Sequence, residues 1–137
     1  MMTVKKNFEI MAEVKEVQLH IFCPASIVVN CDEQWTLEAV SNIIKNCIEH
    51  TNANGKVCVK VAQDNIATHL YIEDDGEGIE PEHLPHIFER FYKSSNNADS
   101  VGIGLSMARQ IILRQEGVIT AESEVGKGTR FHVKFYS

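Results

Sequence analysis

The sequence lacks both a long apolar run and an excess of basic residues, and each absence narrows the function. Its 137 residues carry 13 Lys and Arg against 19 Asp and Glu, a formal net charge of -6. An acidic chain does not attract nucleic acid or an anionic membrane surface, so we expect neither a nucleic-acid partner nor direct membrane contact. No run approaches the roughly 20 apolar residues of a membrane span, and no leader-like segment opens the chain.

Cysteine is sparse and scattered. The four cysteines show no Cys-x-x-Cys pair, and neither they nor the six histidines have the spacing of a zinc site. Two disulfides are allowed by number, but buried, reduced thiols are favoured. The length and the ordinary apolar content, 44%, predict one domain with a single core.

The first 50 residues predict two short strands and a long helix. Residues 1–16 fit a strand or a helix equally well, and the sequence leaves that open. Val17 to Cys23 and Ile27 to Cys31 have strand character on either side of a Pro-containing turn. Asp32 is a candidate N-cap for a helix that runs to about His50.

Two faces of this helix differ in character. On one face Glu38, Asn42 and Asn46 stand one turn apart, close to Glu49 and His50. Asn is a poor helix former, so two of them in a helix interior indicate either a functional face or a solvated one. The opposite face is apolar at helical spacing and predicts the core residues Leu37, Val40, Ile44, Cys47 and Ile48.

The rest of the chain predicts two hairpins, a loop and a second helix. Lys56 to Ala62 and Ala67 to Ile72 alternate as an antiparallel pair. Later segments comprise a short helix within Pro81–Tyr92, a polar loop at Lys93–Ser100, a helix from Gly102 to about Gln115 with Leu105, Ala108, Ile111 and Ile112 on its core face, and strands at Val118–Glu122 and Thr129–Phe135. This order predicts an α+β layer fold with helices on one face of a mixed sheet.

An acidic, glycine-containing turn follows the second strand of the first hairpin. Gly76 and Gly78 allow a sharp turn and a close approach to a flat ligand, and Asp74 can accept a hydrogen bond from an amino group on it. An ordinary Asp-Gly turn is the alternative. Gly102 and Gly104 open a helix whose first amides can hold phosphate oxygens. Neither stretch is a Walker loop or a dinucleotide fingerprint.

Five motifs together resemble the ATP-binding catalytic domain of sensor histidine kinases, within the wider family shared with DNA gyrase and the MutL repair proteins. Residues 42–51 (NIIKNCIEHT) resemble the N box, and residues 74–79 (DDGEGI) resemble the G1 box. Residues 87–93 (IFERFYK) resemble the F box, residues 102–106 (GIGLS) the G2 box, and residues 126–129 (GKGT) the final glycine motif. The order and spacing of the motifs are those of the family.

The resemblance implies a Bergerat fold, a two-layer α/β sandwich with a mixed, mostly antiparallel sheet and helices packed on one face. It implies an ATP-binding catalytic domain over residues 17–137, with residues 1–16 as a linker or N-terminal extension. It also implies ATP and Mg2+ as ligands. Phe88 and Phe91 would anchor a lid over residues 93–101 that closes on the nucleotide.

The resemblance also assigns roles to residues of the site. Asp74 would bind the adenine amino group with support from Thr129, and Asn46 would coordinate magnesium, an oxygen ligand suited to that cation. No catalytic residue is assigned with certainty. The remaining implied nucleotide contacts are Asn42, His50, Gly76, Gly78, Ile79, Lys93, Gly102, Gly104 and Leu105.

Three features depart from the family pattern or allow another register. Glu49 stands where a basic residue is common, and Ser100 where a further glycine is common, so nucleotide affinity and the lid hinge are open to change. Glu38-x-x-x-Asn42 also fits the related ATPases, in which the Glu activates water and Asn42 would hold the metal. We favour the kinase register, because residues 46–51 continue as the kinase N box does.

No histidine of the chain has the His-Glu-x-x-Thr/Asn-Pro context of a kinase phosphoacceptor. The expected function is therefore to bind Mg-ATP and donate the γ-phosphoryl group to a histidine on a separate dimerisation domain of the same parent kinase, and so indirectly to serve a response regulator. We expect a cytoplasmic fragment of a membrane-bound sensor. The alternatives are a stand-alone serine kinase of the anti-sigma type and a non-catalytic nucleotide-binding module.

Overall fold

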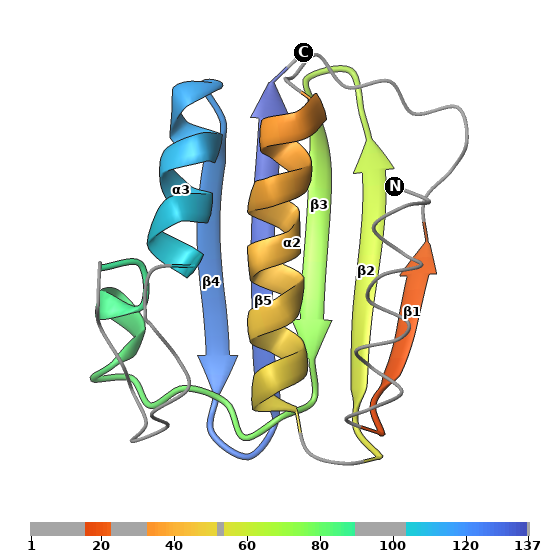
Figure 1. The fold of residues 1–137 in the computed structure, drawn as a ribbon, viewed down its shortest axis with the longest axis vertical. Coiled ribbons are helices and arrows are strands. Elements are labelled where there is room, and N and C mark those ends of the chain that lie inside the picture. The colour runs from red at the N-terminus through yellow and green to blue at the C-terminus, as the bar shows by residue number, and fades with distance from the viewer. Residues whose placement is uncertain (1–15, 23–32, 52–53, 90–103, 137) are drawn as a thin grey trace.

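A five-stranded mixed sheet carries two helices on one of its faces (Figure 1). The computed structural model describes residues 16–22, 33–51, 54–89 and 104–136. The strand order is β1-β2-β3-β5-β4; β1 pairs with β2 in parallel, and the other pairs are antiparallel. The elements are β1 (Gln18–Phe22), α2 (Glu33–His50), β2 (Lys56–Gln63), β3 (Ala67–Asp74), the 3₁₀ turn η1 (Leu84–His86), α3 (Gly104–Arg114), β4 (Val118–Glu124) and β5 (Gly128–Tyr136).

The strands alternate between the core and the outer face because successive side chains point to opposite sides of a sheet. The side facing the helices is apolar, and α2 and α3 lie over it and contact each other. The sheet contributes Val57, Val59, Leu70, Ile72, Phe131, Val133 and Phe135 to the core. The α+β fold, with two layers and a mixed, mostly antiparallel sheet, is confirmed.

Helix α2 follows the predicted amphipathic pattern. Val40, Ile44, Cys47 and Ile48 are buried as expected. Ala39 and Ile43 are also buried, because α2 packs on both the sheet and α3 and so needs a wider apolar stripe than one row. The described helices include none long and apolar enough to cross a membrane.

The short helix expected within Pro81–Tyr92 is a single 3₁₀ turn in its described part, up to Glu89. Pro85 has no amide hydrogen to continue an α-helical ladder, and the turn instead uses three-residue spacing, from His86 N to the carbonyl of His83 at 2.9 Å. The expected strand at 27–31, the Asp32 cap, the side chain of Leu37 and most of residues 1–16 lie outside the described residues, as does the loop at 93–100.

Candidate functional site

Asp74 lies at the end of β3 and is held from three sides. Its Oδ1 accepts hydrogen bonds from the backbone N of Gly76 at 3.0 Å and of Thr129 at 3.2 Å. Thr129 is its register partner on β5. The thiol of Cys47, on α2, is a polar neighbour of the carboxyl and stabilises its charged form. A carboxylate has about four lone-pair sites, so Asp74 keeps capacity for a ligand donor.

Burial sets the electrostatics of this carboxyl. Burial raises the pKa of Asp74 above its usual value, while the amide of Gly76, the thiol of Cys47, the amide of Thr129 and the charge of His50 oppose that rise. The pKa of Cys47 is raised by burial and by Asp74, so the thiol stays protonated and remains a donor. The pair therefore presents a partly desolvated acceptor, where a hydrogen bond to an incoming amino group is stronger than in water.

The glycine turn after Asp74 fits closely against two other elements. A Cβ on Gly76 would lie 2.3 Å from the carbonyl oxygen of His50, at the end of α2. Gly78 has φ +78°, and a Cβ there would lie 2.3 Å from the carbonyl oxygen of Glu124. Only glycine allows both contacts, so the turn is fixed between α2 and the β4–β5 connection.

Ser123 is a site residue that the sequence did not reveal. Its Oγ accepts a hydrogen bond from the amide of Ile79 at 2.7 Å and lies 2.9 Å from both the carbonyl oxygen of Gly128 and Oγ1 of Thr129. One hydroxyl therefore joins the turn after Asp74 to the start of β5. The available signal was its position opposite Thr129 in the last hairpin, which requires the register of that hairpin to be known.

The polar face of α2 extends from this turn towards the start of α3. His50 Nδ1 lies 3.6 Å from Oε1 of Glu77, in the glycine turn. Asn42, two turns earlier and about 12 Å along the axis, packs beside Gly104, and its Nδ2 lies 3.7 Å from the sulfur of Met107. Asn46 lies between them and is half-buried.

The structure thus brings most of the expected site residues to one side of the molecule. Asp74, Thr129 and the glycine turn form one end, and Asn42 with the first turn of α3 forms the other. Leu105 is half-buried and packs against the core. Lys93 and Gly102 lie outside the described residues. The amide oxygen of Asn46, placed between the two ends, is a neutral hard donor of the kind magnesium accepts when phosphates supply the other ligands.

A model of one protein family matches most of the chain. The family of histidine kinase-, DNA gyrase B- and HSP90-like ATPases matches residues 31–136. The heme sensor protein HssS of Staphylococcus saprophyticus is 39% identical over 110 residues, which is 80% of this chain and 24% of that protein. The sensor histidine kinase YclK of Bacillus subtilis is 35% identical over 136 residues, 96% of this chain and 28% of that protein. The chain spans about a quarter of the length of these curated relatives.

Solved structures show the same fold. The catalytic domain of the histidine kinase ThkA, in a nucleotide-free form, aligns with a TM-score of 0.85 at 23% identity over 98% of this chain and 89% of that one. Full-length ShkA in complex with AMPPNP aligns with a TM-score of 0.86 at 20% identity over 98% of this chain and 29% of that one.

Proposed function

The chain belongs to the family of histidine kinase-, DNA gyrase B- and HSP90-like ATPases, and from this we propose that it binds Mg-ATP and donates the γ-phosphoryl group to a histidine on a separate dimerisation domain. That domain would belong to the same parent sensor kinase, and the phosphoryl group would pass on to a response regulator. The similarity to sensor histidine kinases supports this reading over the other classes of the family.

The observation that supports nucleotide binding most directly is the environment of Asp74. Two backbone amides fix the carboxylate at a strand end while leaving it acceptor capacity. An adenine amino group would donate to this acceptor. Guanine would instead present a carbonyl oxygen at the equivalent position, and two acceptors cannot form a hydrogen bond. A site built around one substrate hydrogen bond can discriminate by roughly 10⁴-fold or more.

The other end of the site is suited to phosphates. The first turn of α3 lies at the positive end of the helix dipole, which favours a negatively charged group. Gly104 begins this helix beside Asn42. Because Gly104 has no side chain, a phosphate oxygen could approach its backbone closely. Asn46 would hold the magnesium, which neutralises phosphate charge. Lys93 and Gly102 would add phosphate contacts.

The kinase step needs an acceptor that is placed in line with the γ-phosphate, because phosphoryl transfer depends chiefly on positioning and charge stabilisation. We propose that the dimerisation domain supplies this histidine and that the present chain supplies only the donor. The parent protein would be a membrane-bound sensor with this domain on the cytoplasmic side.

Two measurements on the 137-residue chain test this function. Calorimetric titration with ATP and GTP in the presence of Mg2+ should show binding of ATP and little of GTP. Incubation with labelled ATP should give phosphohistidine only when a dimerisation domain carrying a His-Glu-x-x-Thr-Pro helix is added. Equal binding of both nucleotides would remove Asp74 from adenine recognition. Rapid ATP turnover by the chain alone, abolished by Glu38→Gln, would favour the ATPase register instead.

A further inference from the structure

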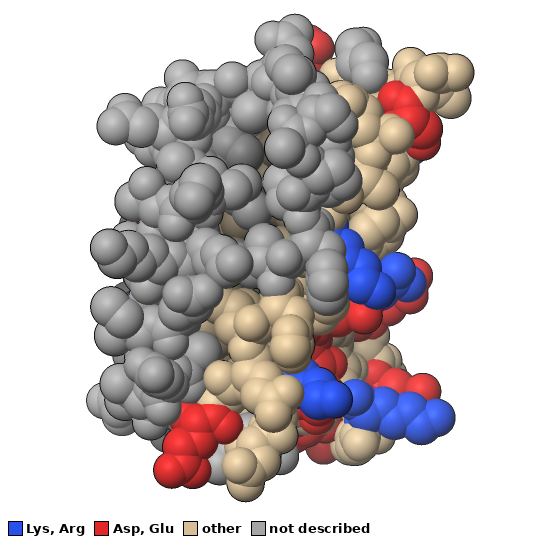
Figure 2. Space-filling view, turned by 90° about the vertical axis from the view of Figure 1, so that its right-hand side faces the viewer, with Lys and Arg blue, Asp and Glu red and all other residues tan. Residues whose placement is uncertain are grey.

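The outer face of the sheet, away from both helices, carries a stack of aromatic and imidazole rings. His132 on β5 stacks on Tyr71 of β3 with ring centroids 4.6 Å apart, and on His69 of β3 at 5.1 Å. Figure 2 looks onto the β1 edge and shows charged side chains gathered along its right-hand border, which is this outer face. The nucleotide site proposed above uses none of these rings.

The two histidines point their ring nitrogens at each other. His69 Nδ1 lies 2.9 Å from His132 Nε2. His69 Nε2 lies 3.0 Å from Oδ2 of Asp64, in the β2–β3 turn. An ionised carboxylate can only accept, so Nε2 of His69 carries its proton and Nδ1 keeps a lone pair directed at His132.

Asp64 is itself fixed. Its Oδ1 accepts hydrogen bonds from the amides of Ile66 and Ala67, both at 2.8 Å. These amides, with the hydrogen bond to His69, hold the pKa of Asp64 below its usual value, so the carboxylate stays ionised. A carboxylate that orients the far nitrogen of a histidine is the usual outer-shell partner of a metal-bound imidazole.

We propose that His69 Nδ1 and His132 Nε2 bind one divalent transition-metal ion of the Cu2+, Ni2+ or Zn2+ class, with Asp64 as the outer-shell partner and water in the remaining positions. Imidazole suits these metals. With nitrogen–metal bonds of about 2.0 Å, two nitrogens in adjacent square-planar positions lie about 2.8 Å apart, and in a tetrahedral site about 3.3 Å. The observed 2.9 Å matches the adjacent square-planar spacing most closely, and both rings must turn so that their lone pairs converge on one ion instead of facing each other.

Binding needs a change of tautomer and a rotation of both rings about χ2. The proton that Nε2 of His132 shares with His69 moves through solvent to Nδ1 of His132, and the metal takes its place.

The two basic side chains near His69 and His132 each contact another group. Arg130 Nε lies 2.8 Å from Oε1 of Glu73, and its guanidinium lies over the Tyr71 ring at 4.7 Å. Lys134 Nζ lies over the Tyr136 ring at 4.8 Å. Glu122 on β4 raises the pKa of His132 by its negative charge, and the same charge favours a bound cation.

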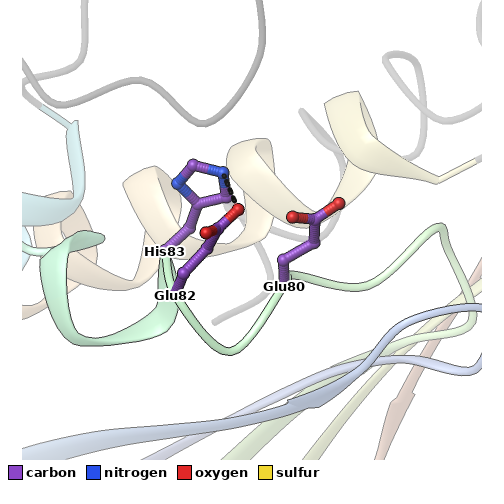
Figure 3. A group of neighbouring side chains, drawn as sticks. All are labelled: Glu80, Glu82 and His83. Atoms are coloured by element: carbon purple, nitrogen blue, oxygen red, sulfur yellow. Dashed lines mark ion pairs between the residues drawn. The ribbon is translucent and has the colours of Figure 1, made fainter.

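The described residues contain two rival groups that any test must separate. Glu80, Glu82 and His83 form one; their ligand atoms lie within 4.8 Å of one another (Figure 3). In that group His83 Nε2 lies 3.6 Å from Oε1 of Glu82, and Glu80 stands apart on the same loop. His20 and Cys58, register partners on β1 and β2, form the second.

Calorimetric titration of the 137-residue chain with Ni2+ tests the proposal, because Ni2+ does not oxidise the free thiols of Cys47 and Cys58. We expect one site, and a melting temperature that rises with Ni2+ because the ion binds the folded state. Asp64→Asn should weaken binding by about 10- to 100-fold, the usual cost of losing an outer-shell partner. His69→Gln and His132→Gln should each weaken it by more.

His83→Gln and Cys58→Ser are the matched controls and should leave the Ni2+ affinity unchanged. All five substitutions are at exposed or half-buried positions, and circular dichroism without metal checks that each variant folds. Unchanged affinity in both His69→Gln and His132→Gln would overturn the proposal, as would loss of binding in either control. Because these residues lie outside the nucleotide site, ATP titration of the same variants distinguishes failure here from failure of the proposed function.

Discussion

The partly buried carboxyl of Asp74 lowers the stability of the fold when it is ionised, and the same carboxyl is the proposed acceptor for a nucleotide amino group. Its raised pKa means that the folded chain holds a proton on this carboxyl more readily than the unfolded chain does. The contribution to stability is therefore fully present below the unfolded pKa, near 4, and is lost as the pH rises through the raised folded pKa. At neutral pH the fold keeps a partly desolvated charge, which a nucleotide amino group would compensate.

Replacing Asp74 by Asn should separate binding from stability. The Asn oxygen can still accept from the amides of Gly76 and Thr129, but no charge is buried, so we expect a melting temperature at pH 7 equal to or above that of the wild type. The advantage should shrink as the pH falls towards 4. ATP binding should weaken sharply. The checks are thermal melts across pH 4–8 and calorimetry.

Asp75→Asn is the matched control for that change. Asp75 is exposed, and its Oδ1 accepts from the amide of Lys56 at 2.7 Å, which an Asn oxygen can replace. It should leave ATP affinity unchanged. If Asp74→Asn bound ATP as well as Asp75→Asn does, Asp74 would have no role in adenine recognition.

Ser123 should matter for binding more than a surface serine does. Ser123→Ala removes the acceptor of the Ile79 amide and the contact with Thr129, at a cost in unfolding free energy of about 1 kcal/mol. Because both partners flank Asp74, ATP affinity should also fall. Thr120→Ala, at an exposed position of the same strand, is the control. Denaturant unfolding and ATP titration test the pair, and equal behaviour of the two variants would contradict the role.

The sequence identifies candidate site residues that lie close together in the chain as a motif. Asp74, Gly76 and Gly78 lie close together in the chain and could be found as a motif. Thr129, expected to support Asp74 in binding adenine, is the register partner of Asp74 on β5. Cys47 and Ser123 were not identified as site residues from the sequence, because their roles come from residues far away in sequence. Cys47 fits the core pattern of α2, and nothing in that pattern shows that its thiol affects the pKa of Asp74.

At the scale of elements, Gly78 and Gly126 have similar positive φ angles but different surroundings. Substitutions at the two positions therefore separate the cost of backbone strain from the cost of a steric clash. Gly78 has φ +78° and Gly126 φ +83°, but a Cβ on Gly126 would meet nothing within 4 Å. Gly126→Ala should cost about 1–2 kcal/mol of unfolding free energy from the left-handed conformation alone. Gly78→Ala should cost more, because its Cβ would displace the carbonyl of Glu124 and shift the turn that follows Asp74.

ATP affinity is the second readout for this pair. It should fall in Gly78→Ala and stay unchanged in Gly126→Ala, measured by calorimetry below each variant's melting temperature. Equal losses of stability and affinity in both variants would show that backbone strain alone, and not the contact with Glu124, fixes the turn.

Elements whose apolar residues recur at strand or helix spacing could be predicted from the sequence. Features that depend on tertiary packing or on the missing amide hydrogen of a proline could not. The alternation in β2 and β3 and the helical spacing in α2 and α3 match the structure within a few residues. The parallel pairing of β1 with β2 could not be derived, because strand order depends on how α2 crosses the sheet. The expected helix after Pro81 is reduced to η1 in its described part because Pro85 interrupts it.

At the scale of the molecule, the two layers divide the chemistry between two faces. The helices cover one face of the sheet, and the proposed nucleotide site lies where α2, the glycine turn and the start of α3 meet. The outer face has no helix over it in the described part of the chain, and its rings and charges lie across β3 and β5. β3 ends at Asp74, and Thr129 is its register partner near the start of β5, so the two proposed sites share these two strands.

The net charge of -6 predicts that ATP binding depends on magnesium. A polyphosphate entering an acidic chain is repelled unless a cation or local amides offset its charge. We expect calorimetry to show tight ATP binding with Mg2+ and much weaker binding with a chelator.

Two substitutions on α2 test which asparagine holds the metal. Asn46→Ala should lower the ATP affinity in Mg2+ towards the value measured with a chelator, whereas Asn42→Ala should retain the magnesium dependence. The reverse outcome would assign the metal to Asn42 and restore the Glu38 register, and equal affinity with and without Mg2+ in the wild type would exclude a metal ligand on α2.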